Sequence, residues 1–327
     1  MSFRRFAWHA GIALALAGGL PPAAIAQDGA KAWPQQPVRF IVPTPPGAPV
    51  NIIVRLLQPK LQAACGQPVV MENKPGAGGN IGAHEVAQAT DGHTILAAPD
   101  TVVTVNPHLY KKMGFDPGKD LVPVTYLASF NQMLVCNPRT GFGNLAALLR
   151  STRKQPVTYA SSGQGGPSHL AMELLLASTN SKIVHEPYRG PSLTAQDLVS
   201  GQVQCGFIAS TVVLPFVKDG RQKGLAVSSG ARSPQAPAIP TVAEDDVVGF
   251  DATFVETLQA PASLPKGVVD KVRGDVTKLL LTPEMKDRLL EQDLITVANT
   301  PAEASRRAAA DQTKWGRIAK TMNLTLD

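Results

Sequence analysis

Short apolar runs alternate along this chain with segments in which apolar residues recur at helical spacing. The runs at residues 38–42, 69–73 and 94–98 predict strands, and the segments 49–61 and 81–89 between them predict helices. Strands that alternate with helices build parallel sheets with crossover helices. The pattern therefore predicts an α/β fold in which each domain is a mostly parallel sheet flanked by helices.

The alternation continues through the middle of the chain and then changes character. Proline-containing segments at 116–123 and 234–240 bracket the middle part, which indicates a domain inserted into another one. We expect residues 34–124 plus 251–327 to form domain I and residues 125–250 to form domain II. Further strands are expected at 133–137, 157–161, 183–187, 205–209, 225–228 and 295–298, and further helices at 145–150, 168–178, 193–200, 212–219, 267–281 and 284–291. A last helix is expected to begin with a capping box formed by Thr300 and Glu303, with Pro301 in its first position.

The first 26 residues have the pattern of a secretory signal peptide. Arg4 and Arg5 are followed by a short apolar run, and an A-x-A site ends at Ala26. The apolar run is too short for an ordinary membrane-spanning helix, although a retained anchor is the alternative. We expect cleavage near Ala26 and a periplasmic mature protein.

Composition narrows the classes of ligand. The chain has 327 residues with a formal net charge of +6, and removal of Arg4 and Arg5 with the signal peptide leaves +4. Aromatic residues make up 5%, and no element gathers lysines and arginines on one face. This argues against nucleic-acid binding and agrees with attraction of small anions.

Cys65, Cys136 and Cys205 show neither a C-x-x-C pair nor the spacing of a zinc site. We expect them to be small buried apolar residues, with a Cys136–Cys205 disulfide as the alternative.

The stretch IVPTPPGAPVNIIVRLL places a stiff loop between a strand and a helix. Ala48 is expected to precede the helix and Pro49 to begin it, so the first N–H groups of the helix have no partner within it. Thr44, Gly47 and Ala48 then lie where a carboxylate accepts backbone hydrogen bonds. The prolines hold the loop in one shape, which lowers the entropy lost on binding. A rigid structural turn is the alternative.

A second loop, in SSGQGGPSHLAMELLLA, has the same arrangement in the inserted domain. Ser162, Gly163, Gly165 and Ser168 are candidate ligand contacts there. In PYRGPSLTAQDL, Ser192 is expected to cap a helix that starts at Leu193, and Tyr188 and Arg189 precede it. Arg189 is a candidate carboxylate partner, with a solvated surface charge as the alternative.

Cofactor and catalytic motifs are not found. In VVMENKPGAGGNIG the glycines give G-x-G-x-x-x-G, one residue away from the dinucleotide-binding pattern. We interpret this stretch as a tight turn followed by a helix that Asn80 caps. There is no G-x-S-x-G elbow and no paired-histidine metal motif, so we expect no cofactor, no metal and no enzyme activity. The isolated histidines are expected to be structural or on the surface.

The ordered motifs together resemble those of one family. They include WPQQPVRFIVPTPPGAPVN, GQPVVMENKPGAGGNIGAHEVAQATDGHTILAA, SSGQGGPSHLAMELL, PYRGPSLTAQDLVSGQV, IPTVAE and APASLPKGVVDKV. Over essentially the whole mature chain they resemble the Bug-type extracytoplasmic solute receptors of tripartite tricarboxylate transporters. The resemblance implies a two-domain periplasmic binding protein of the Venus-flytrap, type II-like class, which binds a small carboxylate between its domains.

The resemblance also implies partners and site residues. We expect a monomer that delivers its ligand to the membrane subunits of such a transporter; a receptor for a signalling partner, or less favoured a secreted α/β enzyme, is the alternative. The family usually has Gly-Gly in the first loop and an aspartate three residues later, where this chain has Gly47-Ala48 and Asn51. The expected ligand-binding residues are Thr44, Gly47, Ala48 and Asn51 in domain I, Ser162, Gly163, Gly165 and Ser168 in domain II, and Asp100, Tyr188, Arg189 and Ser210 as second-rank candidates.

Overall fold

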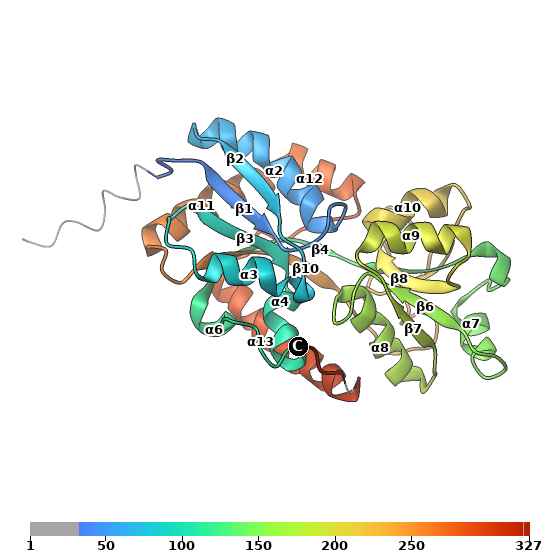
Figure 1. Ribbon diagram of the computed structural model, residues 1–327. Coiled ribbons are helices and arrows are strands. Elements are labelled where there is room, and N and C mark those ends of the chain that lie inside the picture. Colours follow the sequence, from blue (N-terminus) through green and yellow to red (C-terminus); the bar gives the residue numbers. More distant parts are fainter. Residues whose placement is uncertain (1–32, 323) are drawn as a thin grey trace, which may run out of the picture.

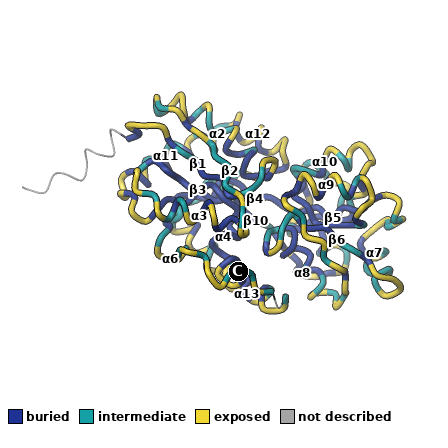
Figure 2. Tube along the Cα trace, viewed as in Figure 1, coloured by how far each residue is buried: buried dark blue, intermediate teal, exposed yellow. Residues whose placement is uncertain are grey.

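The strands assemble into two separate sheets, one in each of two lobes that lie side by side (Figure 1). The structure is a computed structural model that describes residues 33–322 and 324–327, so the predicted signal peptide lies outside the described residues. In each lobe the central strands are buried and the outer faces of the helices are exposed (Figure 2). The predicted α/β architecture, with a sheet flanked by helices in each lobe, is confirmed.

The first lobe is built on a six-stranded sheet with the order β11-β4-β10-β3-β1-β2. Its strands are β1 (Val38–Val42), β2 (Val69–Asn73), β3 (Thr94–Pro99), β4 (Leu121–Phe130), β10 (Phe254–Pro261) and β11 (Ile295–Thr296). Its helices are α2 (Pro49–Cys65), η1 (Ala77–Gly79), α3 (Asn80–Ala87), α4 (Thr101–Thr104), α5 (Asn106–Leu109), α6 (Pro117–Asp120), α11 (Lys266–Leu280), α12 (Pro283–Glu291) and α13 (Pro301–Thr321). The predicted capping box at the start of α13 is confirmed, because Thr300 accepts from the Glu303 N–H and donates its own N–H to the Glu303 carboxylate.

The second lobe is built on a five-stranded sheet with the order β7-β6-β8-β5-β9. Its strands are β5 (Gln132–Cys136), β6 (Thr158–Ser161), β7 (Val184–Pro187), β8 (Cys205–Ala209) and β9 (Lys223–Val227). Its helices are η2 (Pro138–Thr140), α7 (Leu145–Ser151), α8 (Pro167–Thr179), α9 (Pro191–Ser200) and α10 (Ser210–Lys218). The predicted domain boundaries remain a proposal, which this division of the strands supports, since residues 132–227 supply the whole second sheet.

Both sheets are mixed: most strands of each run in one direction, as expected, and antiparallel strands complete the sheets. β1 runs parallel to β2 and β3, whereas β10 runs antiparallel to both β3 and β4. The chain leaves the first lobe along β4 and returns along β10, so these neighbouring strands run in opposite directions. β5 continues from β4 into the second lobe and is antiparallel to β8 and β9.

Cys136 and Cys205 form a disulfide, which corrects the expectation that these two cysteines are unpaired. They lie directly opposite each other in the β5–β8 pair. It is the register of these two strands that brings the sulfur atoms together, and a register between distant strands cannot be derived from residue spacing. Cys65 is unpaired and partly exposed at the end of α2.

Candidate binding site between the lobes

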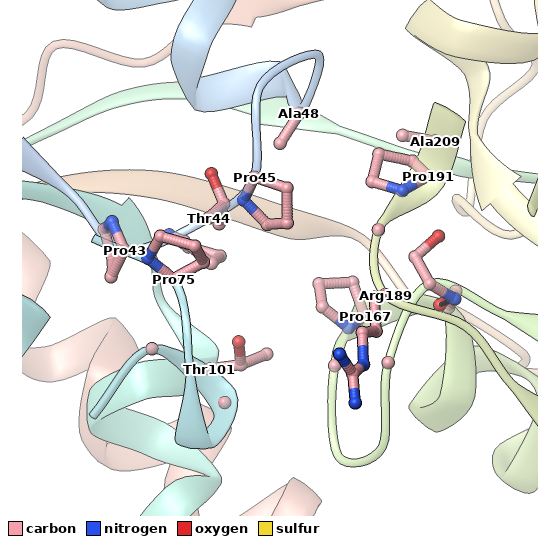
Figure 3. A pocket seen from close by; sticks show the side chains of 18 of the residues that line it. Pro43, Thr44, Pro45, Ala48, Pro75, Thr101, Pro167, Arg189, Pro191 and Ala209 are labelled. Atoms are coloured by element: carbon pink, nitrogen blue, oxygen red, sulfur yellow. Dashed lines mark hydrogen bonds between the residues drawn. The ribbon is translucent and has the colours of Figure 1, made fainter. Parts of the chain in front are cut away.

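A cavity of about 590 Å³ lies between the two lobes, a size suited to a small molecule. In Figure 3, Pro43, Thr44, Pro45 and Thr101 face Pro167, Arg189 and Pro191 across it. The residues that line it are Pro43, Thr44, Pro45, Ala48, Pro49, Pro75, Gly76, Ala77, Gly78, Gly79, Pro99, Thr101, Tyr110, Phe130, Gln132, Ser162, Gly163, Gln164, Gly166, Pro167, Ser168, Tyr188, Arg189, Gly190, Pro191, Ala209 and Glu256.

The loop between β1 and α2 forms one wall. Ala48 is the N-cap of α2 and Pro49 is its first residue, in agreement with the sequence-based prediction. Gly47 has φ +93, in the left-handed region that a residue with a side chain adopts only with strain. Thr44 and Ala48 line the cavity, whereas Gly47 does not.

Asn51 stabilises this loop through its side chain and does not line the cavity. Its side chain is buried, and its Oδ1 accepts hydrogen bonds from the Ala48 N–H at 3.1 Å and the Thr44 hydroxyl at 3.4 Å. The Ala48 N–H is therefore satisfied within the protein. This differs from the sequence-based expectation that the Ala48 N–H and Asn51 meet the ligand, because the two groups bind each other.

The loop between β6 and α8 forms the facing wall. Ser162, Gly163 and Ser168 line the cavity, and the Ser168 hydroxyl accepts a hydrogen bond from the Ser162 N–H at 2.8 Å. Gly165 does not line the cavity; its N–H donates to Nδ1 of the buried His169 at 3.0 Å. The helix begins at Pro167, so the Ser168 N–H in its first turn has no partner inside the helix.

A stack of three rings supports this second loop. The His169 ring packs on His185 with 4.0 Å between ring centroids, and His185 packs on Tyr159 at 4.7 Å. His185 also forms a 2.6 Å hydrogen bond with the Ser161 hydroxyl. Burial lowers the pKa of His169 to about 3 and that of His185 to about 4. Both rings are therefore neutral near pH 7, and His169 keeps the acceptor that the Gly165 N–H needs.

The segment that follows β7 also lines the cavity, through Tyr188, Arg189 and Gly190. The sequence pattern predicts a helix from Leu193 capped by Ser192, but α9 begins at Pro191 with Gly190 as its N-cap. Gly190 has φ +114, which glycine tolerates, and proline suits the first helical position. Arg189 is exposed, and among the described residues it is the one basic side chain that lines the cavity. Burial raises the pKa of Tyr188 to about 12, so its hydroxyl stays protonated.

The loop between β2 and α3 also lines the cavity, and sequence reasoning did not place it there. The expectation that Asn80 caps the helix after the Gly-rich segment 76–79 is wrong, because Gly79 is the N-cap of α3 and Asn80 lies inside the helix. The side-chain carbonyl of Asn80 instead accepts from the Asn106 side-chain amide at 2.7 Å. β1 and β2 are parallel neighbours, so the loops that follow them reach the same edge of the sheet.

An acidic residue from β10 completes the site, and sequence reasoning missed it as well. Glu256 lines the cavity with 1% of its surface exposed, and its Oε2 atom has no hydrogen-bond partner among the described residues. The pKa of Glu256 is raised well above the usual range, mainly by burial and secondly by the nearby Asp100 carboxyl. A hydrogen bond from the Val50 N–H acts in the opposite direction. The expected site residues Asp100 and Ser210 are buried and do not line the cavity.

The two lobes touch on both sides of the cavity. A β-carbon built on Gly190 would lie 3.2 Å from Cγ of Pro45, and one on Gly165 would lie 2.6 Å from Cδ1 of Leu109. The first-lobe and second-lobe loops therefore face each other over a shared space. A cavity between two lobes, with helix N-termini and one arginine on its wall, is the arrangement of a solute-binding protein.

Comparison with known proteins supplies the family. A family model described as the tripartite tricarboxylate transporter family receptor matches residues 53–324, so the chain belongs to this family. Members are periplasmic solute-binding receptors rather than enzymes, and the predicted family and class are confirmed.

Two relatives and one solved structure illustrate the similarity. The chain is 32% identical over 291 residues to the "UPF0065 protein in tcbD-tcbE intergenic region" of Pseudomonas sp. (strain P51), covering 88% of this chain and 86% of that protein. It is 29% identical to the protein BugT of Bordetella pertussis over 98% of both chains. A structure described as R. palustris Rpa4515 with adipate superposes with a TM-score of 0.86 at 28% identity, covering 90% of this chain and 99% of that one.

Metal-binding and membrane-spanning features are absent from the described part of the chain. Within residues 33–322 and 324–327, no group of histidine, cysteine and acidic residues is arranged to hold a metal ion. In the same residues no helix combines the length and the apolar character needed to cross a membrane.

Proposed function

We propose that this chain is a periplasmic receptor that binds a small carboxylate between its lobes and delivers it to the membrane subunits of a tripartite tricarboxylate-type transporter. Family membership supports the receptor class. The bound adipate named for the similar R. palustris structure supports a carboxylate ligand. The predicted signal peptide at residues 1–26 supports export.

The observation that carries this proposal is the chemistry of the second-lobe wall. Arg189 lines the cavity together with Ser162 and Gly163 of the loop before α8 and Ser168 of its first turn. A guanidinium beside the first turn of a helix combines a positive charge with unpaired N–H groups, which suits a carboxylate.

The proposed ligand contacts are the expected residues that line the cavity. In the first lobe these are Thr44 and Ala48, and in the second they are Ser162, Gly163, Ser168, Tyr188 and Arg189. The remaining expected residues do not line the cavity, and we assign them no direct ligand contact: Gly47, Asn51, Asp100, Gly165 and Ser210.

A thermal-shift screen of mono-, di- and tricarboxylates, aromatic acids and amino acids tests the proposal. A ligand at about 100 times its Kd stabilises the protein by about 2.7 kcal/mol, so a hit raises the melting temperature clearly. Arg189→Ala is expected to lower the affinity for the best hit at least about tenfold, since charge-assisted hydrogen bonds contribute about 1.5–3 kcal/mol.

The matched control is Arg153→Ala, which removes an exposed arginine of the second lobe that does not line the cavity. It is expected to bind like the unmodified protein. The absence of any stabilising carboxylate, or equal affinity in the Arg189→Ala protein, would contradict the proposal.

A further inference from the structure

Glu256 differs from the other residues around the cavity in its charge and its surroundings. It is the one acidic residue among the described residues that line the space, and it lies in β10, all of whose residues are buried. Arg189, the one basic residue of the lining within the same described part, comes from the second lobe. The cavity therefore presents a positive group on one lobe and a carboxyl group on the other.

The Glu256 carboxyl group lacks hydrogen-bond partners that its burial calls for. Its Oε2 atom is buried and has no partner among the described residues. A buried acceptor left unsatisfied destabilises a protein by about the cost of its desolvation, so a buried carboxyl beside a ligand cavity calls for a functional explanation. A ligand group that donates a hydrogen bond supplies the missing partner.

The groups around Glu256 explain why the ligand group is a donor rather than a second carboxylate. The Asp100 carboxyl lies nearby at the junction of β3 and α4, and neither of its oxygens has a partner within the described residues. Arg307 and Asp311 of α13 act on Asp100 with opposite effects, and the Val50 N–H of α2 faces Glu256. A second ligand carboxylate placed here would have no cationic partner, because Arg189 is already assigned to the first carboxylate, and it would be repelled by Glu256 or Asp100 whenever either is ionised.

We propose that Glu256 forms a second polar subsite, which accepts a hydrogen bond from an amine or hydroxyl group carried by the ligand away from its carboxylate. This rests on the proposed carboxylate-binding function. A carboxyl group keeps an acceptor oxygen whether or not it is protonated, so a hydroxyl donor fits either form. An ammonium group favours the ionised form of Glu256 and lowers its pKa when it binds. The receptor thus selects an amino or hydroxy acid over a dicarboxylate.

Calorimetry with matched probes tests the subsite. The probes are hexanoate, 6-hydroxyhexanoate, 6-aminohexanoate and adipate, together with the corresponding four-carbon series. In one of the two series, the hydroxy or amino acid is expected to bind at least about tenfold tighter than both the plain acid and the diacid. Glu256→Gln is expected to shrink this preference to about threefold or less and to leave the affinity for the plain acid unchanged.

The pH dependence separates the two donors. With rising pH the affinity for the amino acid probe is expected to increase as Glu256 ionises, at a pH above the usual range of a glutamate, whereas that for the hydroxy acid probe stays constant. Asp100→Asn removes the neighbouring acid and keeps Glu256, so it retains the preference and moves the rise for the amino acid probe to lower pH. This variant also tests the subsite if Glu256→Gln fails to fold.

Two results would overturn the inference while leaving the proposed function intact. One is that, in both series, the diacid binds tighter than the hydroxy and amino acids of the same length. The other is a preference that is the same in folded Glu256→Gln and unmodified protein. If no carboxylate of either series or of the thermal-shift screen binds, the proposed function fails as well.

Discussion

A β-carbon built on Gly47 would lie 2.7 Å from the hydroxyl oxygen of Ser192. Gly47 belongs to the loop before α2 in the first lobe, and Ser192 lies in the first turn of α9 in the second lobe. Real β-carbons essentially never approach another heavy atom so closely, so a side chain at residue 47 would require the Ser192 hydroxyl to rotate or the two lobes to move apart. These two residues do not line the cavity, but Ala48 and Pro191, the next residue after Gly47 and the one before Ser192, do.

Gly47→Ala is therefore expected to hinder closure and to weaken ligand binding at least about tenfold, since closure contributes affinity only while the closed state is accessible. The left-handed backbone at Gly47 adds about 1 kcal/mol of strain when a side chain is introduced. Calorimetry with the best carboxylate measures the loss.

Gly66→Ala is the matched control, because Gly66 also has a left-handed backbone, φ +70, and a β-carbon added there would have nothing within 4 Å. It is expected to lose similar stability and to keep the ligand affinity. Equal affinity loss in both variants would show that strain rather than the contact with Ser192 matters.

Asp293 joins the two lobes beside the strands that cross between them. Its carboxylate accepts hydrogen bonds from the Ser233 hydroxyl at 2.7 Å and from the Asn131 side-chain amide at 3.1 Å, and it is buried. Asp293→Ala leaves these donors unpaired and is expected to lower the free energy of unfolding by about 2–4 kcal/mol. Urea denaturation measures the change. Asp287→Ala, at an exposed aspartate of α12, is expected to change it by less than about 0.5 kcal/mol.

The histidine stack predicts a direction for the pH dependence of stability. The pKa of His169 is lowered to about 3, whereas unfolded histidine titrates near 6.5, so only the unfolded state takes up the proton between these values. The stabilisation is full above about pH 6.5 and is lost as the pH falls toward 3. His185, with a pKa of about 4, acts in the same direction.

Unfolding measured between pH 7 and pH 4 is therefore expected to show stability falling by up to about 1.4 kcal/mol per pH unit for each histidine. His169→Gln is expected to show a shallower slope. A slope unchanged by this substitution would mean that other groups determine the acid sensitivity.

Reduction of the Cys136–Cys205 disulfide is expected to lower the free energy of unfolding by about 2–4 kcal/mol, because the bond closes a long loop in the unfolded chain. Denaturation with and without a reducing agent measures this. Cys65→Ser, at the unpaired cysteine, is expected to leave the effect of reduction unchanged, while an absent effect in the unmodified protein would contradict the prediction.

Sequence patterns predict the elements whose apolar periodicity is regular and miss those whose environment is set by tertiary contacts. β1, α2, β6 and α8 agree closely with their predictions because their periodicity and bounding glycines and prolines are local signals. β4 and β10 were not predicted as strands. β10 reads FVETLQAP and is buried along its whole length, so its polar residues follow no alternation that a sequence pattern reveals.

The same dependence on tertiary contacts explains which site residues could be predicted from the sequence and which could not. Ser168 and Arg189 were found because loops before helix N-termini are recognisable locally. Glu256 was missed because its place at the cavity depends on β10 running beside β3, and the loop at 76–79 was missed because it depends on β2 pairing with β1. Asn51 was expected to meet the ligand, and its hydrogen bond to Ala48 depends on side-chain geometry that spacing alone does not give.

A crystal structure of the protein with the carboxylate that gives the largest thermal shift tests the central claim most directly. The account predicts the ligand enclosed between the lobes, with its carboxylate within hydrogen-bond distance of Arg189 and the first turn of α8. A ligand bound outside this cavity, or held by one lobe alone with Arg189 pointing to solvent, would contradict it.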